Sequence, residues 1–138
     1  MASDCDENPF ALLIGLADRL TEFFDRCASA VGLTPAQAQA LMHIEEPTRM
    51  GDLAHLQTCD PSTATAMVQR LERDGLVVRV IDPHDARARL VQLSPKGRRT
   101  RTRLAAMVSD AGSVIDDLPA EQRTALAQLF GQHARAAR

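Results

Sequence analysis

The chain has 138 residues, of which 45% are hydrophobic and 25% are charged, and its formal net charge is -2. Its longest apolar stretch, Phe10 to Leu16, is far shorter than the roughly 20 residues that a membrane span needs, and no signal peptide precedes it. We therefore expect a single soluble domain that is cytoplasmic and makes no membrane contact.

The cysteines, histidines and aromatic residues argue against several classes of function. Three cysteines without a CxxC pair and four histidines without HxxxH spacing argue against a disulfide framework and a metal site. Four phenylalanines are the only aromatic residues, which argues against the stacking platforms of proteins that bind single strands. No nucleophile elbow, phosphate loop or zinc motif is present, so we predict no enzyme activity, no catalytic residue and no cofactor.

The charged residues are unevenly distributed along the chain. Residues 1–60 carry three arginines against ten acidic residues, whereas residues 61–103 carry ten basic residues against four acidic ones, a balance of +6. A basic segment of this size suits the neutralisation of nucleic-acid phosphates. A solvated basic surface without a partner is the alternative that charge alone leaves open.

The first sixty residues predict three helices. Apolar residues at spacings of three and four indicate a long amphipathic helix from Phe10 to Val31. Thr34 to Gln37 has the pattern of a capping box that begins a second helix, ending near Glu45. Met50 to Leu56 indicates a short third helix.

Asp60 followed by Pro61 predicts the capped start of a fourth helix, which ends at Arg73 before Gly75. On a helical wheel, Ala64, Met67, Val68 and Leu71 fall on one side. Such a helix seats one face in a core, while the other offers hydroxyl, amide and guanidinium groups that bond base edges and phosphates in a major groove. The residues on this polar face are Ser62, Thr63, Thr65, Gln69, Arg70 and Arg73.

A basic β-hairpin and two more helices are predicted after Gly75. Leu76 to Ile81 and Leu90 to Leu93 have the composition of two strands, with turn residues from Asp82 to Asp85 and arginines at 87 and 89 near the tip. Ser94 and Pro95 open a helix that we expect to continue to a break at Pro119, with arginines at 98, 99, 101 and 103 on a solvated or phosphate-contacting face. A last helix covers residues 120–134, with Leu126, Leu129 and Phe130 on one side.

This order of elements predicts a winged helix-turn-helix, a mainly α fold with a small β-hairpin wing. In such a fold one helix crosses the DNA backbone, the next enters the major groove, and an arginine on the hairpin reaches a neighbouring minor groove.

The runs from Asp60 to Arg79 and from Asp82 to Gly97 closely resemble the MarR family of bacterial transcriptional regulators. The resemblance covers nearly the whole chain and is most specific from Thr34 to Gly97. It implies a homodimer on double-stranded DNA, usually a repressor that a small molecule, bound between the dimer helices and the DNA lobes, releases from a near-palindromic operator. It also implies dimerisation helices at residues 1–33 and 98–138, and a DNA-binding lobe at residues 34–97, in one intertwined domain.

The resemblance also implies which residues contact DNA. In the family, the outer face of the recognition helix does so, which corresponds here to Ser62, Thr63, Thr65, Gln69 and Arg70. Arg73 shares that face on the wheel. The wing motif of the family is an Asp and an Arg separated by one residue, and it corresponds here to Asp85 and Arg87, with Arg89 nearby. Asp85 and Arg87 could also form a surface ion pair. The chain departs from the family at Ala66 and at Thr58–Cys59, where relatives often carry a longer polar residue and a glycine or aliphatic turn residue.

Two alternative functions remain open at this point. A regulator of the same fold could sense oxidants through Cys59, because this residue directly precedes a capped helix whose dipole favours a thiolate. Cys27 falls on the apolar stripe and is expected to be packed, and Cys5 lies in an acidic stretch that should blunt its reactivity. A winged-helix module that contacts proteins and not DNA is the other alternative.

Overall fold

The computed structural model describes residues 9–136. Its contacts form two compact units, one of the described residues up to Phe24 together with those from Ser109 onward, and one of residues 25–108. The elements in chain order are α1 (Pro9–Ala30), α2 (Pro35–His43), β1 (Thr48–Arg49), α3 (Met50–Leu56), α4 (Pro61–Arg73), β2 (Val77–Asp82), β3 (Asp85–Leu93), α5 (Pro95–Ser109), α6 (Gly112–Asp116) and α7 (Ala120–Ala136). The mainly helical fold with a small wing is confirmed, while the division into segments 1–33, 34–97 and 98–138 stays a prediction.

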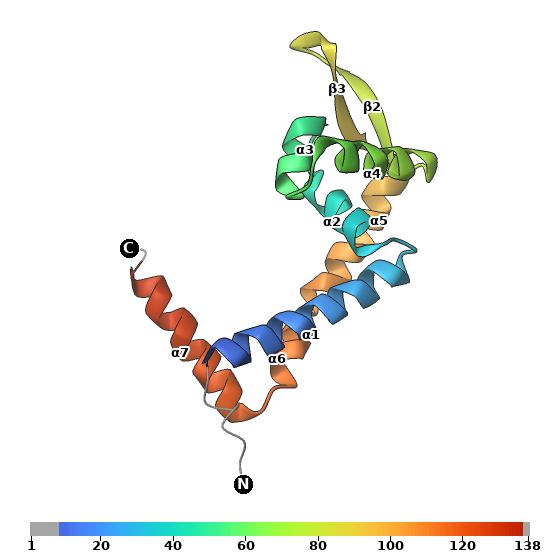
Figure 1. Ribbon diagram of the computed structural model, residues 1–138. Helices are drawn as coiled ribbons and strands as arrows, with labels where there is room; N and C mark the ends of the chain where they lie inside the picture. The colour runs from blue at the N-terminus through green and yellow to red at the C-terminus, as the bar shows by residue number, and fades with distance from the viewer. Residues whose placement is uncertain (1–8, 137–138) are drawn as a thin grey trace. The chain divides into compact units, whose positions relative to one another are not determined.

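The unit of residues 25–108 is a winged helix. In Figure 1 the strands β2 and β3 extend as a narrow arm beyond the helices α3 and α4. The core of the unit is apolar, as expected from the spacing of these residues along the helices and strands. Its largest fully buried side chains are Leu41, Ile44, Leu53, Val68, Leu71, Val77, Val91 and Leu104.

The helix caps predicted at Thr34 and Asp60 are present. At the start of α2, the Gln37 backbone N–H donates to the Thr34 hydroxyl at 3.3 Å, and the Thr34 N–H donates to Gln37 Oε1 at 3.0 Å, which is the reciprocal pattern of a capping box. At the start of α4, the Asp60 side chain accepts from the Thr63 N–H. The predicted apolar face of α4 is buried throughout.

The sheet has three antiparallel strands in the order β1-β3-β2, where the sequence predicted a two-stranded hairpin. The added strand β1 is only two residues long and pairs Thr48 with Val91 and Arg49 with Leu90. A strand this short shows no alternation of apolar and polar residues, so periodicity could not reveal it. The returning strand β3 begins at Asp85 and not at Leu90, so Arg87 and Arg89 lie on the strand itself.

The prediction of one continuous helix from Pro95 to Pro119 is wrong, because the helix breaks between α5 and α6. At the break, the backbone N–H and the hydroxyl of Ser113 both donate to the Asp110 carbonyl, at 2.9 and 2.7 Å. Asp, Gly and Ser are weak helix formers, and a serine hydroxyl that bonds a nearby carbonyl competes with the helical ladder. The spacing of apolar residues alone did not indicate this break.

The other unit has a small apolar core of its own. Leu16 of α1, Val114 of α6, Leu118 between α6 and α7, and Leu126 of α7 form a buried cluster, and Phe23 packs against it. The predicted apolar side of α7 is thus present at Leu126, while the side chains of Leu129 and Phe130 lie outside the described residues. Within residues 9–136, no helix is both long and apolar enough to cross a membrane.

Candidate nucleic-acid interface

The polar face of α4 lies on the outside of the winged-helix unit. Its burial pattern separates the two faces as the helical wheel predicts: the apolar residues are buried, Thr65 is half-buried, and Ser62, Thr63, Gln69, Arg70 and Arg73 are exposed. Ala66 is exposed within this arc, so one position of the face offers only a methyl group. The face therefore presents two guanidinium groups, one amide and three hydroxyl groups.

Hydrogen bonds within the chain hold the three hydroxyls of this face. The Asp60 carboxylate accepts from the Ser62 hydroxyl and from the Thr63 N–H and hydroxyl, the last two at 2.9 and 2.6 Å. The Thr65 hydroxyl donates to the Pro61 carbonyl at 2.8 Å. Each hydroxyl thus keeps free lone pairs that can accept from an amino group on a base edge, but it must leave its present acceptor to donate to a phosphate.

These hydrogen bonds stabilise the ionised form of the Asp60 carboxyl. The hydrogen bond from the Ser62 hydroxyl, followed by those from Thr63, holds the pKa of the Asp60 carboxyl well below its ordinary range. A carboxylate at a helix N-terminus also interacts favourably with the helix dipole. The charged cap therefore fixes the first turn of α4, where Ser62 and Thr63 stand.

The two wing arginines differ in what they contact. Arg87 is exposed, and its side chain has no hydrogen-bond or ion-pair partner within the described part of the chain. The Asp85 carboxylate accepts the Arg87 backbone N–H at 3.0 Å, so Asp85 shapes the backbone at this point and the alternative of an Asp85–Arg87 ion pair is not realised. The Arg89 guanidinium donates to the carbonyls of Ala86 and Ala88, both at 3.2 Å, which folds it back onto its own strand.

A contact that the sequence analysis missed ties the wing to the start of α3. Arg49 donates from Nε and Nη2 to Oδ2 of Asp82, at 3.1 and 2.7 Å. The other carboxylate oxygen, Oδ1, accepts the His84 backbone N–H at 2.8 Å. Asp82 was predicted only as a turn residue, and nothing in the sequence links it to an arginine 33 positions away.

The arginines at 98, 99, 101 and 103 do not all lie on a solvated or phosphate-contacting face, as we had expected. Arg101 donates to the Met42 carbonyl at the end of α2 and forms an ion pair with Glu45 at 2.8 Å. It therefore joins α5 to the segment after α2. Arg98 donates to the Leu93 carbonyl at 3.3 Å, while Arg99 and Arg103 are exposed.

The cysteines and histidines form no recognisable site in residues 9–136. Cys27 is buried, which confirms the predicted packing, and Cys59 is half-buried; Cys5 lies outside the described residues. Thr58, at the departure from the family pattern, has a φ of 51°, the left-handed conformation that glycine adopts at least cost. No group of three or more His, Cys, Asp or Glu side chains in the described segment could hold a metal ion.

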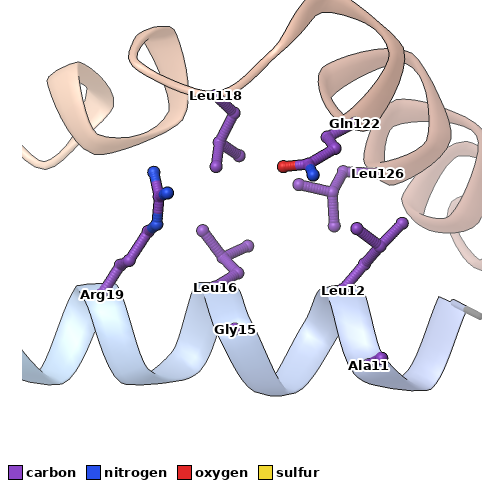
Figure 2. A pocket seen from close by; sticks show the side chains of 8 residues that line it. All are labelled: Ala11, Leu12, Gly15, Leu16, Arg19, Leu118, Gln122 and Leu126. Carbon is purple, nitrogen blue, oxygen red and sulfur yellow. The ribbon is translucent and has the colours of Figure 1, made fainter. Parts of the chain in front are cut away.

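A pocket of about 270 Å³ lies within the unit that contains the chain ends (Figure 2). Most of its lining residues are apolar or small, and they come from α1, α7 and the segment between α6 and α7. Figure 2 shows Arg19 and Gln122 projecting toward the space between these segments, beside Leu16, Leu118 and Leu126. Neither polar side chain has a hydrogen-bond partner among the described residues. The pocket thus offers an apolar wall, a guanidinium group and an amide.

Comparison with known proteins places the winged helix in a family. Residues 33–88 match the MarR family. The transcriptional activatory protein BadR of Rhodopseudomonas palustris is 35% identical over 94 residues, which cover 64% of this chain and 54% of BadR. The uncharacterised HTH-type transcriptional regulator YcgE of Bacillus subtilis is 31% identical over 87 residues, 62% of this chain and 56% of YcgE. The match thus spans about half the length of these curated relatives.

Solved structures match over nearly the whole chain. CouR from Rhodococcus jostii RHA1 bound to p-coumaroyl-CoA has a TM-score of 0.73 and 25% identity, and the match covers 99% of this chain and 96% of that one. The transcriptional repressor CouR bound to a 23-mer DNA duplex has a TM-score of 0.71 and 28% identity, with 97% of each chain covered. Residues 33–88 thus match the MarR family, and the whole chain has the fold of these solved regulators.

Proposed function

We propose that this protein is a sequence-specific regulator of transcription that binds double-stranded DNA as a homodimer in the cytoplasm. The observation that carries the proposal is that one unit holds both the exposed polar face of α4 and the unpaired Arg87 on the wing. A helix with such a face fits the major groove, and a lone guanidinium on a narrow arm fits the minor groove beside it. CouR, a relative in fold and sequence, has been solved on a DNA duplex.

The residues proposed to bind DNA have different roles. Gln69, Arg70 and Arg73 extend from α4 as donors to base edges and phosphates, and Arg70 and Arg73 add positive charge. Ser62, Thr63 and Thr65 accept from base amino groups, because their protons are held by Asp60 and Pro61. On the wing, Arg87 enters the minor groove, while Asp85 and Arg89 fix the strand that carries it.

The homodimer is supported by apolar side chains exposed on the unit that contains the chain ends. Ile14 of α1 is 50% exposed and Ile115 of α6 is 42% exposed, and Leu13 and Leu20 of α1 are exposed as well. Large apolar side chains left in water on one small unit favour burial against a partner. We propose a second copy of this chain as the partner, because two identical winged helices related by a two-fold axis match a near-palindromic operator.

We propose that a small molecule controls the DNA-bound state and that the protein is a repressor released by it. The pocket between α1 and α7 suits an apolar ligand with an anionic group, since Arg19 and Gln122 face an otherwise apolar wall. A ligand shifts the population away from the DNA-binding state only if it binds another state more tightly. CouR is described as a repressor and is solved with an acyl-CoA ligand, whereas BadR is described as an activatory protein.

The alternatives have less support. Cys59 is half-buried, and Cys27, the other cysteine in the described range, is buried in the core, so no observation favours oxidant sensing. A module that only contacts proteins would not need the basic balance of residues 61–103 or a free arginine at the wing.

The test is selection of bound sequences from a random duplex DNA pool at about physiological salt, followed by affinity measurements against salt. We expect an inverted repeat with half-sites about 34 Å apart and a steep loss of affinity as salt rises, because phosphate contacts release counterions. Arg87→Ala should weaken binding about tenfold, since a good contact of this kind contributes roughly 1–3 kcal/mol. Arg123→Ala removes the same charge from an exposed position of α7 and serves as the control.

No enriched sequence, together with weak binding that salt barely changes, would overturn the proposal. That outcome would favour the protein-contact module.

A further inference from the structure

The Asp82 carboxylate lies where β2 and β3 of the wing extend from the helices of the winged-helix unit. Asp82 is the last residue of β2, and its side chain is only 4% exposed. One oxygen accepts two N–H groups of Arg49, and the other accepts the backbone N–H of His84 in the turn. Arg49 is the last residue of β1 and directly precedes α3. A single carboxylate therefore links the start of α3 to the turn that leads into β3.

Strand pairing alone does not fix the outer part of the wing. The pairing of β1 with β3 ends at Arg49 and Leu90, so residues 85–89 have no β1 partner. The pairing of β2 with β3 shifts register between Ile81 and Asp82. A bulge of this kind bends a strand and redirects the residues beyond it. The direction of the tip that carries Arg87 thus needs a further restraint, and the Arg49–Asp82 contact lies at that point.

The contact also balances the charge of a nearly buried carboxylate on the wing. The His84 N–H, followed by the Arg49 hydrogen bond, lowers the pKa of Asp82, so this carboxylate is ionised at neutral pH. Asp82 raises the pKa of Arg49, with smaller contributions from Asp85 and Asp52. Without Arg49, a nearly buried carboxylate would be left unpaired on an arm that has to approach phosphates.

We propose that Arg49 is a positioning residue for DNA recognition: by holding Asp82, it sets the direction in which the wing presents Arg87 to the minor groove. This inference rests on the proposed DNA-binding function. Arg49 acts through Arg87, so its contribution to affinity disappears when Arg87 is absent.

A double-mutant cycle on the selected duplex tests this dependence. Arg49→Gln should weaken binding about five- to tenfold in the wild-type background and less than about twofold in the Arg87→Ala background, since coupled residues give non-additive changes. Arg49→Lys, which keeps the charge but supplies a single donor group, should fall between wild type and Arg49→Gln. The matched control is Arg79→Gln, which breaks the ion pair between Arg79 on β2 of the same wing and Glu72 of α4; its small effect should be equal in both backgrounds.

The outcomes separate the two proposals. An Arg49→Gln effect of equal size with and without Arg87 would overturn the positioning role, even if the variant unfolds at a lower urea concentration. An Arg49→Gln protein that binds as tightly as wild type would overturn it as well. Failure of the wild-type protein to bind any selected duplex would instead overturn the DNA-binding function itself.

Discussion

At the scale of single residues, hydrogen bonding decides which polar groups remain available to a partner. The hydroxyls of Ser62 and Thr63 donate to Asp60, Arg89 folds onto its own strand, and Arg101 pairs with Glu45. Arg87 is left with an exposed guanidinium that has no partner within residues 9–136. The sequence alone cannot distinguish these side chains, whereas the structure shows which of them already form hydrogen bonds or ion pairs within the chain.

Asp60 gives the protein a predictable response to acid. Its folded-state pKa is depressed, so the stability it contributes is present above the ordinary carboxyl pKa of about 4 and is lost as the pH falls toward the folded-state pKa. Asp60→Asn keeps an acceptor for the Thr63 N–H but removes the charge. The urea midpoint of wild type should exceed that of the variant by a constant amount between about pH 5 and pH 7, and the difference should shrink below about pH 4. A difference that grows as the pH falls would contradict this account of the cap.

At the scale of elements, local signals predicted the helices of the lobe well. The capping residues Thr34 and Asp60 each stand directly before a helix, and the apolar spacing of α4 gave its buried face. Two features escaped prediction for physical reasons. Strand β1 exists only because β3 pairs with it, and the Arg49–Asp82 contact joins residues brought together by the fold alone. Of the candidate site, the positions on α4 and the wing were predictable, but the restraint on the wing was not.

The junction of α5 with the end of α4 depends on Gly97. A Cβ built at Gly97 would lie 1.9 Å from the Leu76 carbonyl oxygen, a backbone atom that cannot move away easily. The same carbonyl accepts the Ser94 N–H, and the Ser94 hydroxyl donates to the Gly75 carbonyl. The first turn of α5 thus packs directly against the backbone of Gly75 and Leu76, between α4 and β2.

Gly97→Ala should therefore lower the free energy of unfolding by about 2 kcal/mol, because an inserted methyl group in a packed junction forces backbone shifts. Gly51→Ala is the matched control in α3 of the same lobe, where a Cβ meets nothing within 4 Å. Its stability should stay equal or rise by less than about 1 kcal/mol. Chemical denaturation of both variants measures this, and equal stability of the two would contradict the close approach at Leu76.

At the scale of the whole molecule, the proposed function divides between the two units. Residues 25–108 carry the proposed DNA contacts, and the unit containing the chain ends carries the exposed apolar side chains and the pocket. The proposed dimer places two copies of α4 and two wings on one operator, so each half-site is read by the same residues. The central claim is that α4 reads the major groove and Arg87 the minor groove, once in each half-site.

Chemical footprinting on the selected duplex tests that claim most directly. With wild type, we predict protection of major-groove guanine N7 atoms in two half-sites about 34 Å apart, with minor-groove protection beside each. With Arg87→Ala, the minor-groove protection should disappear while the major-groove protection remains at a protein concentration that saturates the duplex. Protection of a single half-site, or minor-groove protection that is unchanged without Arg87, would contradict the account.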